Sequence, residues 1–140
     1  MDSGLTKDWS LHPQLAQDTV PVGDLPLART LLTNDANYPW LILVPRLPGL
    51  VELIDLEENA QVQLLGEIAA TARALKSITQ CDKLNIAALG NQVPQLHVHV
   101  IARRRDDAAW PKPVWGIKPA LVYEASQKET LLATLRARLC

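Results

Sequence analysis

Two of the three histidines are separated by a single residue in the segment GNQVPQLHVHVI, residues 90–101. Alternate residues of a strand share a face, so a strand here places Gln95, His97 and His99 together, with apolar residues on the other face. Three interpretations of this pair stay open: an ordinary solvent-facing strand, nucleophilic catalysis, and a metal site whose third ligand, without a recognisable metal spacing, would be His12, Asp106 or Asp107. Imidazole suits catalysis because its pKa of about 6.5 allows proton transfer near neutral pH.

Length and composition limit the class of protein. The chain of 140 residues has 48% hydrophobic and 21% charged residues, which indicates one folded domain, residues 1–140, and argues against disorder. A formal net charge of -1 argues against strong nucleic-acid binding. No apolar run reaches the roughly 20 residues of a membrane span, so no membrane association is expected. Cys81 and Cys140 form no CxxC pair, and a reducing, cytoplasmic location is expected.

The first half of the chain predicts two strands and a long helix. Residues 25–33 and 40–44 are the strands, and the Asn-Asp turn at residues 34–37 joins them. The second strand is apolar throughout, which is typical of a strand covered on both faces. Asp55 is expected to cap a helix over residues 56–79. Its predicted apolar stripe consists of Val62, Leu65, Ile68, Ala69, Ala72, Leu75 and Ile78.

The second half predicts two more strands, residues 84–89 and 95–103. A proline-containing loop over residues 104–119 and a last helix over residues 127–139, capped by Ser126, follow. This order predicts an α+β fold around an antiparallel sheet. Residues 1–23 are expected to be an N-terminal extension, with a short helix around residues 11–18.

The segment QLHVHVI resembles the motif of the histidine triad (HIT) hydrolases and transferases, in which His-x-His-x-His precedes two apolar residues. Residues 90–93 (GNQV) stand where the family has a Gly-Gln-Ser/Thr-Val-like segment. Residues 41–46 (LILVPR) match an apolar strand that ends in Pro and a basic residue, and Trp110 with Pro111 matches a later Trp-Pro element. The resemblance covers about residues 25–116. It implies a five-stranded antiparallel sheet with a long helix packed on it and a C-terminal helix.

The resemblance also assigns roles, with two departures. It makes His97 the nucleophile that attacks the α-phosphorus of a nucleotide, one ring nitrogen held by the backbone carbonyl of His99. His99 itself is placed near the leaving group. Gln95 replaces the first triad histidine, so it can position a neighbour but cannot titrate. Trp40 follows Pro39 where the family has Gly-His, and it either stacks on a base or closes the edge of the core.

Further polar residues match positions around the nucleotide. Asn34 or Asp35 is placed at the ribose, although both are also ordinary turn residues. Leu27 and Leu43 either line the base pocket or pack in the core. The resemblance places three more side chains at the phosphate or leaving group, namely Gln92, Asn91 and Asn85. For Asn91 and Asn85 the alternative is that the side chain only satisfies the turn. A basic cluster after the motif is either a solvated face or steers phosphate; its members are Arg103, Arg104 and Arg105.

We therefore expect a hydrolase or transferase that acts on a nucleoside 5'-phosphoryl bond of the phosphoramidate or dinucleoside polyphosphate type. The expected intermediate is nucleotidyl-His97, and no metal or cofactor is expected. Two alternatives stay open: a nucleotide-binding protein with little turnover because of Gln95, and a metal-binding His-x-His domain. The resemblance also implies a homodimer formed through the second half of the long helix and the strand at residues 84–89. The loop with Trp110 and Trp115 is expected to reach an active site.

Overall fold

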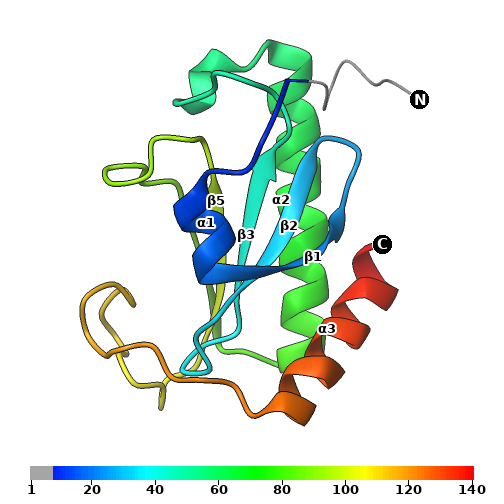
Figure 1. Cartoon of the computed structure of the whole chain (residues 1–140). Coiled ribbons are helices and arrows are strands. Elements are labelled where there is room, and N and C mark those ends of the chain that lie inside the picture. Colours follow the sequence, from blue (N-terminus) through cyan, green and yellow to red (C-terminus); the bar gives the residue numbers. More distant parts are fainter. Residues whose placement is uncertain (1–7) are drawn as a thin grey trace.

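A computed structural model describes residues 8–140. These residues form a five-stranded antiparallel sheet in the order β1-β2-β3-β5-β4, which confirms the α+β prediction (Figure 1). No helix of this part of the chain is long and apolar enough to cross a membrane. The elements are α1 (Pro13–Asp18), β1 (Thr19–Asp24), β2 (Ala28–Thr33), β3 (Trp40–Pro45), the 3-10 helix η2 (Leu53–Asp55), α2 (Glu58–Thr79), β4 (Lys83–Ala87), β5 (Val98–Arg103) and α3 (Ala125–Leu139).

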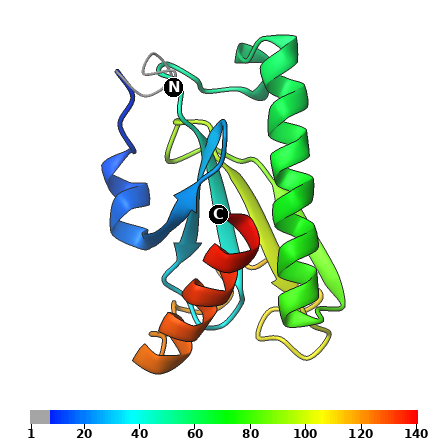
Figure 2. The same cartoon turned by 90° about the vertical axis from the view of Figure 1, so that its right-hand side faces the viewer.

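The two faces of the sheet are covered by different elements. Helices α2 and α3 pack on one face, and α1 with the loop after β5 covers the other (Figures 1 and 2). Strand β3 is buried along its whole length, which confirms the prediction of a strand covered on both sides. Its residues alternate between the two cores: Leu41 and Leu43 face α2, whereas Trp40, Ile42 and Val44 face α1.

The sheet begins earlier in the chain than the sequence pattern predicted. The helix expected around residues 11–18 is present as α1, but the next six residues form β1 and not part of a loose extension. Pro21 and Gly23 obscure the strand pattern, and the register shifts between them. Both residues are tolerated because β1 is an edge strand. Strand β2 then starts at Ala28, three residues later than expected.

The long helix is present, but its start and its buried face differ from the prediction. Asp55 ends the 3-10 helix, where its carboxylate accepts hydrogen bonds from the N–H groups of Val51 and Glu52. Glu57 is the N-cap residue of α2. Val62 and Leu65, assigned to the apolar stripe, are 72% and 67% exposed.

Glu67 explains why the apolar stripe was placed wrongly. Its carboxylate is buried and accepts hydrogen bonds from the N–H groups of Leu27 and Ala28, both at 2.8 Å. These bonds satisfy two donors at the start of β2, so a charged side chain occupies the core face of α2. A prediction based on hydrophobicity alone does not place a glutamate on the buried face of a helix.

The bounds of the remaining helices and strands differ from the predicted bounds by only a few residues. Strand β4 ends at Ala87, β5 begins at Val98, and α3 begins at Ala125. Glu124, and not Ser126, caps α3, because the Glu124 carboxylate accepts the hydrogen bond of the Ser126 N–H.

Candidate active site

His97 and His99 lie on the sheet face that points away from α2. His99 is opposite Ile42 of β3, and His97 directly precedes β5. The backbone N–H of Leu96 donates to the Leu50 carbonyl at 3.0 Å, which fixes the approach to the strand. Leu96, Val98 and Val100 point into the α2 core, as the alternation predicted. Both histidines are only 6% exposed, so the solvent-facing interpretation is wrong.

The hydrogen bond of His97 fixes which ring nitrogen is free. Its Nδ1 lies 2.7 Å from the backbone carbonyl oxygen of Gln95. A carbonyl only accepts, so Nδ1 carries the proton and the neutral ring has its lone pair on Nε2. The partner is Gln95 and not the expected His99 carbonyl, because Gln95 lies before the paired part of β5 and its carbonyl is not used by the ladder.

His99 has the opposite tautomer. The indole Nε1–H of Trp40 donates to His99 Nδ1 at 3.0 Å. Indole only donates, so Nδ1 carries the lone pair and the proton of the neutral ring is on Nε2. Burial, and secondarily the nearby His97, lowers the pKa of His99 to about 4. At neutral pH His99 is therefore an uncharged hydrogen-bond donor through Nε2.

Aromatic rings surround His99. Its ring centroid is 5.7 Å from that of Trp40, 5.0 Å from that of Trp115 and 4.9 Å from that of His97. Trp115 is 36% exposed and comes from the loop after β5. This loop thus reaches the histidine pair of its own chain, and Trp115 covers His99 from the solvent side.

Gln95 connects the site to the N-terminal segment. Its side-chain Oε1 accepts from the backbone N–H of His12 at 2.8 Å, and its Nε2 donates to the Ser10 carbonyl at 2.9 Å. Both ends of the side-chain amide are therefore engaged with backbone groups of the N-terminal segment. Among the described residues, no group of three His, Cys, Asp or Glu side chains is arranged to hold a metal ion.

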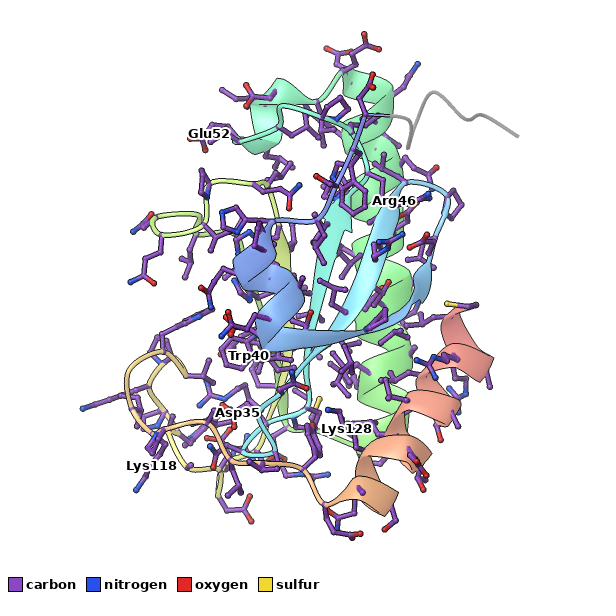
Figure 3. The ribbon with its side chains drawn as sticks, viewed as in Figure 1. Asp35, Trp40, Arg46, Glu52, Lys118 and Lys128 are labelled. Carbon is purple, nitrogen blue, oxygen red and sulfur yellow. The ribbon has the colours of Figure 1, made fainter. Side chains whose placement is uncertain are left out.

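Asn34 and Asp35 lie at the end of the sheet away from His97. Trp40 is opposite Ile101, so the loop before β3 extends past that end of β5, while His97 lies beyond the other. Figure 3 shows Asp35 and Lys128 at this end and Arg46 toward the opposite one. The structure does not bring the proposed ribose residues to the histidines.

Both residues also have partners within the protein. Asn34 Oδ1 accepts from the Lys128 amine at 2.8 Å. Asp35 is buried, and its carboxylate accepts from the N–H groups of Asn37 and Leu121 at 3.0 and 3.2 Å. These contacts tie the β2–β3 loop to α3 and to the chain before it, so the turn interpretation accounts for both residues.

Asn85 and Arg103 belong to a buried network and not to a phosphate site. Arg103 is 1% exposed; its Nε lies 2.7 Å from Asp107 and one terminal nitrogen donates to Asn85 Oδ1 at 2.8 Å. Burial opposes ionisation of Asp107, but hydrogen bonds from Arg103 and from backbone N–H groups prevail and lower the pKa of Asp107 to about 2. The solvated-face interpretation holds for the exposed Arg104 and Arg105 and is wrong for Arg103.

The other predicted residues divide between loop and core. Gln92 and Asn91 are exposed in the turn after Gly90, whose φ of 78° favours glycine. They stay candidates for phosphate contacts. Leu27 and Leu43 are buried in the core under α2, so the core interpretation is confirmed. Trp40 is buried with its indole bonded to His99, a role that sequence reasoning missed because the pairing depends on the β3–β5 register.

Comparison with known proteins identifies the family. The HIT domain model matches residues 14–106. A histidine triad protein of Bradyrhizobium japonicum is 58% identical, with 94% of this chain and 98% of that chain covered and a TM-score of 0.93. One from Marinobacter aquaeolei VT8 is 44% identical, with coverages of 94% and 96% and a TM-score of 0.91. One from Sinorhizobium meliloti 1021 is 41% identical, with coverages of 96% and 99% and a TM-score of 0.92. No curated protein matches. With this fold, this histidine pair and these relatives, the chain belongs to the histidine triad family.

Proposed function

We propose that the protein transfers a nucleotidyl group from a nucleoside 5'-phosphoryl compound to His97 and then to water. The observation that carries this proposal is the 2.7 Å contact between His97 Nδ1 and the Gln95 carbonyl. It directs the free lone pair to Nε2 while the ring is held in place. A neutral, oriented imidazole is a competent nucleophile toward phosphorus.

The reaction has two steps. His97 Nε2 attacks the α-phosphorus, the bond from phosphorus to the leaving group breaks, and the leaving group departs with the electron pair. Water then attacks phosphorus, the N–P bond breaks, and one proton of the water is released to solvent. The Nε2–H of His99 and backbone N–H groups stabilise the negative charge on oxygen. The proposal requires no metal or cofactor.

Substitution of His97 tests the proposal. Wild type, His97→Ala and His12→Ala are assayed for AMP release from diadenosine triphosphate and adenosine 5'-phosphoramidate with a chelator present. Loss of a nucleophile costs at least about 1,000-fold in rate, so His97→Ala should be inactive. His12→Ala is the matched control, because it removes the third histidine and should retain activity. Equal rates for wild type and His97→Ala would contradict the proposal.

The second candidate function is nucleotide binding with little turnover. The contacts of Gln95 favour it, because an amide that is bonded to Ser10 and His12 takes no part in proton transfer. This alternative predicts that AMP binds wild type and His97→Ala with similar affinity by calorimetry and that neither forms product. Failure of AMP to bind either protein would contradict both functions.

We also propose a homodimer that forms along β4. This strand is one of the two edges of the sheet, and Ile86, on the α2 side beside Val100, is 51% exposed. Val62 and Leu65 are exposed on the flank of α2 opposite Glu67, which reaches β2. An exposed apolar patch at a sheet edge indicates an interface. Light scattering should show a dimer that Ile86→Asp dissociates and the matched control Val122→Asp does not.

We also propose that the protein is cytoplasmic. Cys81 and Cys140 are free thiols, which fits the expected cytoplasmic location.

A further inference from the structure

We propose that Trp40 is a positioning residue that keeps His99 a hydrogen-bond donor and not an acid. As a result, the site prefers substrates whose leaving group departs as an anion, such as a nucleoside polyphosphate. This inference rests on the proposed nucleotidyl transfer and narrows its substrate class.

The contact between Trp40 and His99 opposes protonation of His99. A proton on Nδ1 would place two N–H groups against each other across the 3.0 Å that now separates indole Nε1 from Nδ1. Burial of the ring and the adjacent His97 oppose the cation further, which agrees with the low pKa of about 4. A neutral imidazole does not release its Nε2 proton near neutral pH. His99 can therefore stabilise negative charge but cannot protonate a leaving group.

Within residues 8–140, the groups around His99 supply no substitute acid. Strand β3 contributes Ile42 and Trp40, β4 contributes Ala87 opposite His99, and the loop contributes Trp115. None of these four side chains ionises. The adjacent titratable side chain is His97, which is consumed as the nucleophile.

Leaving groups differ in what this arrangement can release. An amine or an alkoxide must gain a proton as the bond to phosphorus breaks. A nucleoside diphosphate or a nitrophenolate departs as a stable anion and needs none. With an acid absent, the rate should depend steeply on the pKa of the leaving group.

The substrate test compares three AMP derivatives at pH 8: diadenosine triphosphate, the p-nitrophenyl ester of AMP and adenosine 5'-phosphoramidate. We expect kcat/KM at least about tenfold higher for the first two. An equal or higher value for the phosphoramidate, with His97→Ala inactive, would overturn this inference and leave the proposed function standing. Absence of turnover with all three would overturn both.

Nuclear magnetic resonance tests the role of Trp40 without any substrate. In the wild-type protein labelled with nitrogen-15, His99 should show the Nε2–H tautomer from pH 5 to 8. A scalar coupling between Trp40 Nε1 and His99 Nδ1 should be visible across the hydrogen bond. An Nδ1–H tautomer in the wild type would overturn the proposal, whether or not any variant folds.

Two matched variants sharpen this result. Trp40→Phe keeps an aromatic ring but removes the donor, so His99 should become a mixture of tautomers with a raised pKa. The preference against the phosphoramidate should then shrink. Trp115→Phe replaces an indole at a similar distance from His99 and should leave the tautomer unchanged. An equal change of tautomer in both variants would show that packing, and not the Trp40 hydrogen bond, controls His99.

Discussion

The polar side chains at the two ends of β5 differ in how many of their hydrogen-bonding groups have partners within the protein. At the Arg103 end, the guanidinium donates to both oxygens of Asp107, to Asn85 and to the Lys112 carbonyl. Its cationic plane also lies near the rings of Tyr38 and Trp110. At the histidine end, each ring uses only Nδ1 in its hydrogen bonds to the described residues, 8–140. In the neutral tautomers that these bonds select, Nε2 of His97 carries a lone pair and Nε2 of His99 carries a proton.

This difference separates a residue that stabilises the fold from one that can react. A buried charge with all its partners in place has no capacity left for a substrate. A neutral ring with one fixed hydrogen bond is oriented and still has a reactive atom. The perturbed pKa values of Asp107 and His99 do not distinguish the two ends, because both arise in buried networks.

Removal of the Arg103 charge should give the largest loss of stability. Arg103→Met leaves Asp107 buried without its partner, and breaking such a pair costs about 3–5 kcal/mol. Urea unfolding measures this loss. Arg104→Met is the matched control: the residue is exposed, and the expected change is within about 0.5 kcal/mol. Similar effects of the two substitutions would remove the contrast between the ends of β5.

The low pKa of His99 predicts a pH dependence of stability. The folded protein resists protonation of His99 down to about pH 4, whereas the unfolded chain binds the proton below about 6.5. The contribution is therefore complete above the unfolded pKa and is lost as pH falls toward the folded one. The free energy of unfolding should rise by about 3 kcal/mol more in wild type than in His99→Asn between pH 4 and 7. Parallel curves would contradict the assigned environment of His99.

Loss of the Gln95 side chain should have a smaller effect. Gln95→Ala removes two hydrogen bonds to the N-terminal segment, at 2.8 and 2.9 Å, and should cost about 1–2 kcal/mol. Hydrogen exchange should become faster in residues 9–12. His97 should keep its tautomer, because the backbone carbonyl is still present. A large drop in kcat without a change in stability would instead place Gln95 in the chemistry.

Asn34 should show the smallest effect. Asn34→Ala removes the contact with Lys128 and should lower the free energy of unfolding by at most about 0.5 kcal/mol. Calorimetry should give an unchanged affinity for AMP, since the residue lies at the far end of the sheet. A clear loss of affinity would restore Asn34 as a ribose ligand.

The sequence predicted the helices and strands better than it predicted which side chains form hydrogen bonds with one another. Alternation along residues 95–101 correctly separated His97 and His99 from Leu96, Val98 and Val100. It placed the short helix α1 and the buried strand β3 as well. It missed β1, where Pro21 and Gly23 interrupt the pattern, and it excluded Glu67 from the core because a carboxylate there depends on two N–H donors 39 and 40 residues away.

The candidate site shows the same division. A motif identifies His97 and His99 because their spacing alone puts them on one face. The partners of Arg103, Asn85, Trp40 and Asp35 lie on other strands or loops, so their roles follow from strand register and not from local pattern. Without that register, the sequence leaves Trp40 between a base contact and the core edge, Asp35 and Asn85 between a nucleotide contact and a turn, and Arg103 between solvent and phosphate.

Trapping the intermediate tests the central claim most directly. The protein is mixed with diadenosine triphosphate, quenched in alkali within the first turnover, digested and examined by mass spectrometry. The account predicts an adenylyl group on the peptide that contains His97, attached through Nε2, with none in His97→Ala. Turnover that proceeds with the adenylyl group on another residue, or with none on His97, would contradict the account.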